Sequence, residues 1–262
     1  IFTGVEDKKT ALENVREGKA DLFLSNISPN KIEDKNLDMY QTKSEIWSLL
    51  LNPAPNAAPY QLKVNNTVEF NPFAIREIRY ALNFLLDRKY IADEILKGFG
   101  TANIAPVISG TANSWKFEVQ AKNLGISVNG NKEAAIKDIN KAMERAAVLS
   151  ENQGKLFKRN GFWNFSGKDV TVKFVVESDD SEEKTAFANY VAKLLGEAGL
   201  KVVQIKENKE KSEDLVYKTN PAQLSWNIYA EAIKEETASP FRDKLIVDNM
   251  SSITGNQPGW NK

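Results

Sequence analysis

The sequence of 262 residues contains neither cysteine nor histidine. Without cysteine, the chain forms no disulfide, no thiolate metal site and no cysteine nucleophile. Without histidine, it lacks the usual proton shuttle and the commonest metal ligand, so a Ser-His-Asp triad and the usual zinc sites are excluded. Chemistry based on carboxylates stays open, as in glycoside hydrolases or magnesium sites.

The sequence also lacks an excess of either charge and a long apolar run. Lys and Arg together number 35, as do Asp and Glu. A chain without a basic field has no general attraction for nucleic acid or for an anionic membrane. The longest apolar run, IWSLLL at 46–51, is far shorter than the roughly 20 residues of a membrane span. Hydrophobic residues make up 42%, which is ordinary for a globular protein.

The ends of the sequence suggest a piece of a longer protein. The chain begins at Ile1, within what reads as structured sequence, and ends in the loop-like GNQPGWNK. We therefore expect a fragment, from which a signal peptide would be missing in any case. Four N-x-S/T sequons are present, close to the number expected by chance in an Asn-rich chain; they begin at Asn26, Asn65, Asn164 and Asn249.

Hydrophobic spacing predicts a series of helices and strands. Apolar residues at intervals of three and four predict helices over 5–17, over 73–97 with a second start at Asp87, and over 131–149. Strands are expected at 20–25 and 60–66, and a loop at 65–72. The segment 52–59, with three prolines in eight residues, predicts a boundary or a crossover between lobes.

The clearest local unit lies in the second half of the chain. VTVKFVV at 170–176 predicts a strand, and Asp179 with Glu182 three residues later is typical of a capped helix start. Gly199 ends that helix before a second strand at 201–205. Two strands joined through a helix predict a parallel β-α-β crossover, so the fold class is α/β. The charged run at 206–214 is typical of a solvated helix face or loop.

The segment QLSWNIYAEA at 223–232 alternates like a strand with two different faces. One face would be apolar, and the other would carry Ser225, Asn227, Tyr229 and Glu231. Strict alternation places Trp226 on the apolar face. A half-exposed strand with a polar solvent face explains this pattern without a ligand; the alternative is a strand that lines a cleft.

Several motifs occur together in a distinctive order. The segment 70–106 contains N-P-F, then R-x-x-R-x-A-L-x-x-x-x-D-R, then an Ile, a Gly and a Pro downstream. By residue type alone it is a helical pair that packs one lobe. Upstream is TALENVREGKADLFLS, and downstream are KDVTVKFVVESDDSEEKTAFANYVAKLLGEAGLKVVQI and VYKTNPAQLSWNIYAEA. This order resembles family 5 of the extracellular solute-binding proteins, the peptide- and nickel-type receptors of ABC importers, in a form associated with archaeal members.

The resemblance implies a periplasmic-binding-protein-like α/β fold of type II, similar to cluster C. Such receptors have two lobes that close by hinge motion around a ligand. Residues 1–58 would be the end of the first lobe and the crossover linker. Residues 59–262 would be most of the second, C-terminal lobe, with a mixed sheet flanked by helices and an incomplete end.

The resemblance also implies where the ligand binds. Peptide-binding members usually carry Trp-x-x-Asp, in which the Asp pairs with the α-amino group of the peptide. Trp226 matches that Trp, and Tyr229 stands at the position of the Asp. A phenol with a pKa near 10 does not neutralise an ammonium group at pH 7. Glu231 on the same face would then supply the charge, or the ligand is a neutral polar molecule such as a sugar. The implied ligand-binding residues are Trp226, Asn227, Tyr229 and Glu231.

The function implied is that of a substrate-capture subunit of an ABC importer. We expect a monomer outside the cytoplasm, anchored to the membrane through a part of the protein beyond this sequence. Its partners would be a peptide or small-molecule ligand and the permease subunits, with no nucleic acid, metal, cofactor or catalytic residue. Two alternatives are a surface or sensory binding module with the same fold, and a carboxylate-only glycoside hydrolase that uses two of Glu231, Glu235, Glu236 and Asp243.

Overall fold

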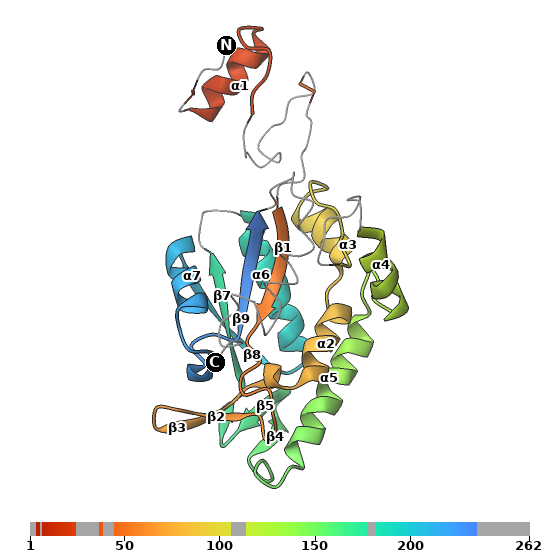
Figure 1. The fold of residues 1–262 in the computed structure, drawn as a ribbon, viewed down its shortest axis with the longest axis vertical. Coiled ribbons are helices and arrows are strands. Elements are labelled where there is room, and N and C mark those ends of the chain that lie inside the picture. Colours follow the sequence, from red (N-terminus) through yellow and green to blue (C-terminus); the bar gives the residue numbers. More distant parts are fainter. Residues whose placement is uncertain are drawn as a thin grey trace. The chain divides into compact units, whose positions relative to one another are not determined.

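The structure is a computed structural model that describes residues 4–5, 7–24, 37–38, 45–105, 114–177 and 182–234. The chain divides into two compact units, residues 1–42 and residues 43–262. Figure 1 shows the elements of both units. The division between lobes that the sequence suggests at 58/59 stays a prediction.

The first unit contains helix α1 (Lys8–Arg16), as the sequence predicts. The carboxylate of Asp7 caps it by accepting hydrogen bonds from the amides of Lys9 and Thr10. The strand predicted at 20–25 is wrong over the described residues 20–24, which form no strand. Strands are stabilised by pairing with a neighbour, and within the described residues no segment pairs with this one. Leu22 and Leu24 are consequently exposed.

The second unit is built on a four-stranded sheet in the order β1-β9-β7-β8. Its strands are β1 (Glu45–Leu51), β7 (Thr171–Glu177), β8 (Lys201–Glu207) and β9 (Ile228–Lys234). β7 is parallel to both β8 and β9, whereas β1 is antiparallel to β9. The predicted parallel β-α-β unit is confirmed, with α6 (Glu182–Glu197) between β7 and β8. Asp179, its predicted cap, lies outside the described residues.

Both faces of this sheet are covered (Figure 1). On one face, Phe174 and Val176 of β7 join the main core with the buried side of α6. On the other face, Val175 joins a smaller cluster with Val216 of α7 (Lys209–Tyr217). Most of the charged run at 206–214 therefore lies in helix α7. A helix is one of the two forms that the sequence predicts for this run.

Two long helices extend the main core. α2 (Arg76–Leu85) packs against α5 (Lys132–Ala147), and their buried sides include Ile78 and Ile139. Asp87 caps the short α3 (Arg88–Tyr90), which continues into a π-helical turn, η3 (Ile91–Ile95). These helices lie within the ranges 73–97 and 131–149 that the sequence predicts, and the second start at Asp87 is confirmed. One further helix, α4 (Ser114–Asn123), was not predicted.

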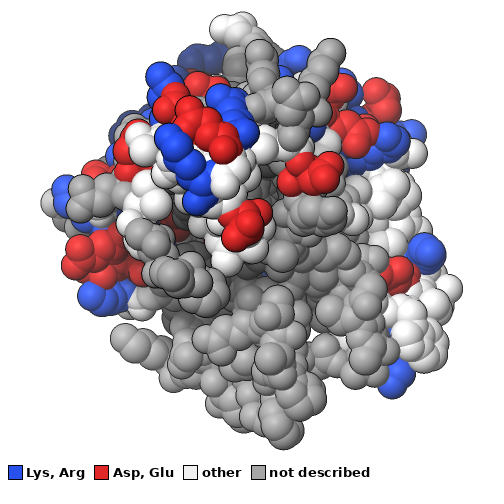
Figure 2. Space-filling view, turned by 90° about the horizontal axis from the view of Figure 1, so that it is seen from above, with Lys and Arg blue, Asp and Glu red and all other residues white. Residues whose placement is uncertain are grey.

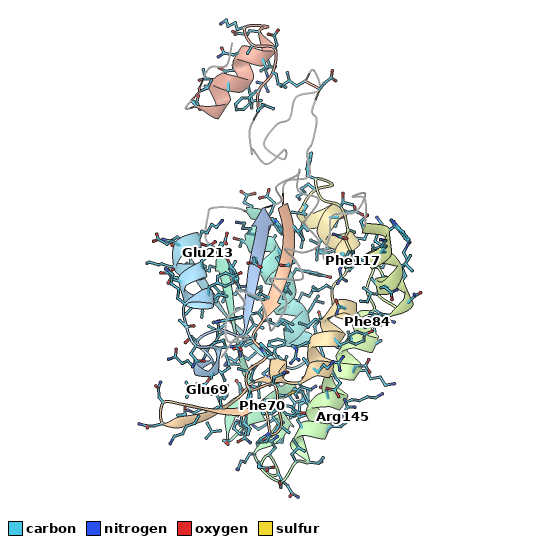
Figure 3. All side chains as sticks on the ribbon, in the orientation of Figure 1. Glu69, Phe70, Phe84, Phe117, Arg145 and Glu213 are labelled. Carbon is cyan, nitrogen blue, oxygen red and sulfur yellow. The ribbon has the colours of Figure 1, made fainter. Side chains whose placement is uncertain are left out.

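Short strands and turns surround these elements. The predicted strand at 60–66 is confirmed as β2 (Gln61–Val64), but the loop predicted at 65–72 is wrong. Its centre forms β3 (Thr67–Phe70), which pairs with β2 and buries Phe70 against Phe165, with ring centroids 5.7 Å apart. Figure 3 labels Phe70 and its neighbour Glu69 on this hairpin. The other short elements are η2 (Pro72–Ala74), β4 (Leu156–Arg159), β5 (Phe162–Phe165), β6 (Lys168–Asp169) and η4 (Pro221–Gln223).

Candidate functional site

The carboxyl ends of β7, β8 and β9 lie along one edge of the central sheet. Glu177 pairs with Glu207 in the parallel register of β7 and β8, and Glu231 lies at the centre of β9. β1 begins at this same edge, because Glu45 pairs with Lys234. We call this the carboxyl edge. In open α/β sheets, ligands bind beside the carboxyl ends of the strands, so this edge is where a site is expected.

The segment that leads into β9 differs from the predicted strand at 223–232. η4 ends at Leu224, which adopts a left-handed φ of 48°, and β9 begins at Ile228. Strict alternation therefore holds only after that point. Trp226 lies in the same cluster as Tyr229, on the α7 face, whereas Ile228 joins the main core on the other face. The prediction that Trp226 shares a face with Ile228 is wrong, because the chain is not extended where it would have to alternate.

Asn227 anchors the beginning of β9. Its side chain is 3% exposed. The side-chain Oδ1 accepts a hydrogen bond of 2.8 Å from the amide of Lys173 on β7, and Nδ2 donates one of 3.2 Å to Oδ1 of Asn71. The amide nitrogen of Asn227 also donates to the carbonyl of Lys173 at 2.8 Å. This polar side chain is thus already engaged within the protein.

Two further asparagines complete this buried network. Asn52, directly after β1, donates from Nδ2 to the carbonyls of Pro221 and Trp226 at 2.9 and 3.0 Å. Asn71 donates from Nδ2 to the carbonyls of Asn52 and Ala54 at 2.9 and 2.7 Å. Both side chains are fully buried. The network fixes the end of β1, the start of β9 and the turn before α2 relative to one another.

Tyr229 lies beneath the carboxyl edge and is 1% exposed. Its hydroxyl donates a hydrogen bond of 2.6 Å to Oε1 of Glu177. The other oxygen of Glu177, Oε2, lies 2.8 Å from the ammonium of Lys184 on α6. Burial, followed by the bond to Glu177, raises the pKa of Tyr229, so the phenol keeps its proton and acts as a donor.

Glu231 is a partly buried carboxylate on the α7 face of β9. Its Oε1 accepts a short hydrogen bond from the hydroxyl of Tyr217 at the end of α7. Burial is the main cause that raises the pKa of Glu231, and the negative charges of Glu177 and Glu213 raise it further. The Tyr217 bond and the charge of Lys209 act in the opposite direction. Among the described residues, no ion pair to Glu231 is formed within 4.0 Å.

The four predicted site residues thus lie in the two residues before β9 and in β9 as far as its centre, in different roles. Trp226, Tyr229 and Glu231 share the α7 face, and Asn227 connects to β7 and the turn before α2. The indole Nε1 of Trp226 is buried and has no hydrogen-bond partner within the described part of the chain. Glu235, Glu236 and Asp243, the other carboxylates considered for a hydrolase, lie outside the described residues.

Sequence reasoning missed three residues of this edge, namely Glu177, Lys184 and Tyr217. Glu177 was detectable in principle, because it is the polar residue that directly follows the apolar strand 170–176. Lys184 and Tyr217 carry no such signal, since they lie on helices that only the fold brings to the edge.

Over the face in Figure 2, the described basic and acidic side chains are interspersed. Nowhere in the described part of the chain do three or more Asp or Glu side chains gather so that they could hold a metal ion. No helix among these residues combines the length and the apolar character that crossing a membrane requires.

Comparison with known proteins identifies a family whose model matches most of the chain. The family model described as "Bacterial extracellular solute-binding proteins, family 5 Middle" matches residues 1–240. No curated protein matches the sequence at a significant level.

Solved structures with the same fold bind different molecules. A periplasmic oligopeptide-binding protein of an ABC transporter from Thermotoga maritima, with mannohexaose bound, matches with a TM-score of 0.55 at 13% identity. NikZ from Campylobacter jejuni in complex with Ni(L-His) matches with a TM-score of 0.59 at 14% identity. The oligopeptide-binding protein AppA from Bacillus subtilis, in complex with a nonapeptide, gives 0.51 at 15% identity. At these identities the likeness shows the fold alone.

These matches cover nearly all of the chain and less than half of each solved protein. They cover 95%, 97% and 91% of this chain, but 42%, 44% and 41% of the Thermotoga, Campylobacter and Bacillus proteins, respectively. The predicted α/β fold of the periplasmic-binding-protein type is therefore confirmed.

Proposed function

The chain belongs to family 5 of the bacterial extracellular solute-binding proteins, and from this premise we propose that it is part of the substrate-capture subunit of an ABC importer. The observation that carries the proposal is the family match over residues 1–240. The structure adds an edge of parallel strand ends with polar side chains, the usual place for a ligand in an α/β fold. The solute would bind outside the cytoplasm and be delivered to permease subunits.

In this proposal, the ligand meets the carboxyl edge at Glu231. Glu231 presents a carboxylate that lacks an ion-pair partner among the described residues, so it suits an ammonium, a guanidinium or a hydroxyl group of a solute. Trp226 and Tyr229 form the aromatic floor behind it, and Asn227 holds the beginning of β9 in place. The cationic group that Asp binds in peptide receptors would thus meet Glu231, two residues further along the strand.

The protein captures its solute without chemical turnover, because the role of a receptor is binding and closure. A membrane anchor beyond this sequence would hold it near the permease, and it would work as a monomer. The ligand would be peptide-like or another polar solute.

A ligand screen on the full-length protein tests this function. Peptides, oligosaccharides and nickel–histidine complexes are added separately while thermal unfolding is recorded. A ligand that binds the folded protein raises the melting temperature, since a concentration of 100 times Kd stabilises by about 2.7 kcal/mol. We expect a shift with one of these classes and recovery of the ligand unchanged. If none of these classes raises the melting temperature, the proposal is contradicted. Consumption of the ligand would contradict it as well.

The role of Glu231 is tested with one substitution and one matched control. Glu231→Gln removes the charge and keeps the shape of the side chain, so it should weaken binding of a cationic ligand more than that of a neutral one. Glu144→Gln, at an exposed position of α5, removes a carboxylate far from the edge in sequence and should leave binding unchanged. Equal affinities of wild type and Glu231→Gln for a cationic ligand, measured by calorimetry, would remove Glu231 from the site.

A further inference from the structure

The tip of the β2–β3 hairpin carries a complete N-x-T sequon. Val64 pairs with Thr67 across the hairpin, so Asn65 and Asn66 form a two-residue turn. All three residues of the sequon, Asn65 to Thr67, are exposed, and Asn65 has a positive φ of 55°. In Figure 1 the hairpin projects from the body of the second unit, at the opposite end from the start of β1. An enzyme can therefore reach this turn on the folded protein.

The other sequon in the described part of the chain has the opposite environment. Asn164 on β5 is 1% exposed. Its Nδ2 lies within hydrogen-bond distance, at 3.3 Å, of both the carbonyl of Phe162 and Oδ1 of Asp169. Its two neighbours in the strand, Trp163 and Phe165, are buried as well. Modification at Asn164 would require the hairpin of β4 and β5 to unfold. The sequons at Asn26 and Asn249 lie outside the described residues.

We propose that Asn65 is an acceptor for an N-linked glycan and that Asn164 is not. The donor would be a lipid-linked oligosaccharide phosphate or diphosphate. The side-chain nitrogen of Asn65 attacks C1 of the first sugar, the bond from C1 to the phosphate oxygen breaks, and the lipid phosphate leaves. The nitrogen loses one proton to a base of the transferase. Thr67, whose hydroxyl donates to the carbonyl of Val64 at 3.1 Å, supplies the hydroxyl that completes the sequon.

The first test uses folded full-length protein, an oligosaccharyltransferase and its lipid-linked donor. Trypsin separates the two acceptors, because Asn65 lies in the peptide of residues 64–76 and Asn164 in that of residues 160–168. Mass spectrometry should find glycan on the first peptide alone. Synthetic peptides with each sequon should both be modified, which would show that folding protects Asn164. An unmodified peptide of residues 64–76 from the folded protein would overturn the proposal, as would equal modification of both sites.

Substitutions in the turn separate the acceptor from its surroundings. Asn65→Gln and Thr67→Val should each abolish the modification, whereas Asn66→Gln keeps the sequon and should retain it. Loss of modification in all three would show that the turn conformation, and not the sequon, decides the result, and would overturn the proposal. Circular dichroism of each variant establishes that it is folded.

Use of this site in the cell rests on the proposed function, since such transfer takes place outside the cytoplasm. The second test therefore examines protein purified from its own cells, together with the accessibility of the protein to protease added to cells whose cytoplasmic membrane is intact and whose outer layers have been removed. If the protein is accessible to protease and Asn65 is unmodified, the proposed glycosylation is overturned and the proposed function is left intact. Protected protein would instead contradict the extracytoplasmic location of the proposed function and, with it, use of the site in the cell.

Discussion

At the scale of single residues, the buried asparagine network is the feature that most constrains the structure. Asn71 accepts hydrogen bonds from Asn227 and from the amide of Phe73, and donates to two carbonyls. Asn71→Ala would leave these buried groups without partners, at a cost of about 2–3 kcal/mol in the free energy of unfolding. Urea denaturation measures this loss.

The matched control for this substitution is an exposed asparagine. Asn123→Ala, at the end of α4, should change the free energy of unfolding by less than about 0.5 kcal/mol. Equal effects of the two substitutions would show that the network contributes little.

Glu231 should make stability depend on pH. Its pKa is raised in the folded state above the ordinary value of 4.5, so above about that pH the folded state binds more protons than the unfolded state. Stability from this group is therefore present below pH 4.5 and is lost as the pH rises toward the raised pKa. We therefore expect the free energy of unfolding of Glu231→Gln, relative to that of wild type, to increase as the pH rises above 4.5.

Denaturation at a series of pH values checks this expectation. Glu144→Gln controls for the loss of one exposed carboxylate. If the difference between Glu231→Gln and wild type were constant with pH, the burial of Glu231 would have no energetic consequence.

At the scale of elements, the packing of α5 against α2 depends on one glycine. Gly130, just before α5, has a φ of +65°, and a Cβ there would lie 2.6 and 2.7 Å from the carbonyl oxygens of Phe84 and Leu86. Gly130→Ala therefore meets both left-handed strain and a backbone clash. Gly154→Ala meets only the strain, about 1–2 kcal/mol, since its φ is +72° and the space around it is open.

Gly130→Ala should consequently destabilise more than Gly154→Ala, by at least about 1 kcal/mol. Urea unfolding of the two variants in parallel gives the comparison directly. The same loss in both would mean that the loop before α5 moves away from α2 without cost.

At the scale of the whole molecule, the two units differ in what stabilises them. The main core and the central sheet belong to residues 43–262. A chain that begins at residue 43 should therefore unfold in one cooperative transition, with a melting temperature close to that of the complete sequence. Calorimetry of the two chains tests this, and a broad transition without an enthalpy peak in the shorter chain would contradict it.

The sequence by itself determined the elements in which local signals agree. Periodic apolar residues with a cap or a terminal glycine predicted α1, α2, α5 and the β7-α6-β8 unit, because such patterns depend only on residues near one another in the chain. The family also followed from the order of local motifs. The predictions for 20–25, 65–72 and 223–232 were wrong in part, since strand pairing and backbone turns, and not residue type alone, decide where a strand begins and ends.

Tertiary structure alone decided the environment of the candidate site. The sequence placed Trp226, Asn227, Tyr229 and Glu231 near one another, but alternation could not show that the chain turns at Leu224 and moves Trp226 to the face of Tyr229. The partners of these residues come from β7, from α7 and from the turn before α2. Burial and hydrogen bonding are set by such distant neighbours. The sequence can therefore indicate which residues belong to a site, but only the fold decides which of them can contact a ligand.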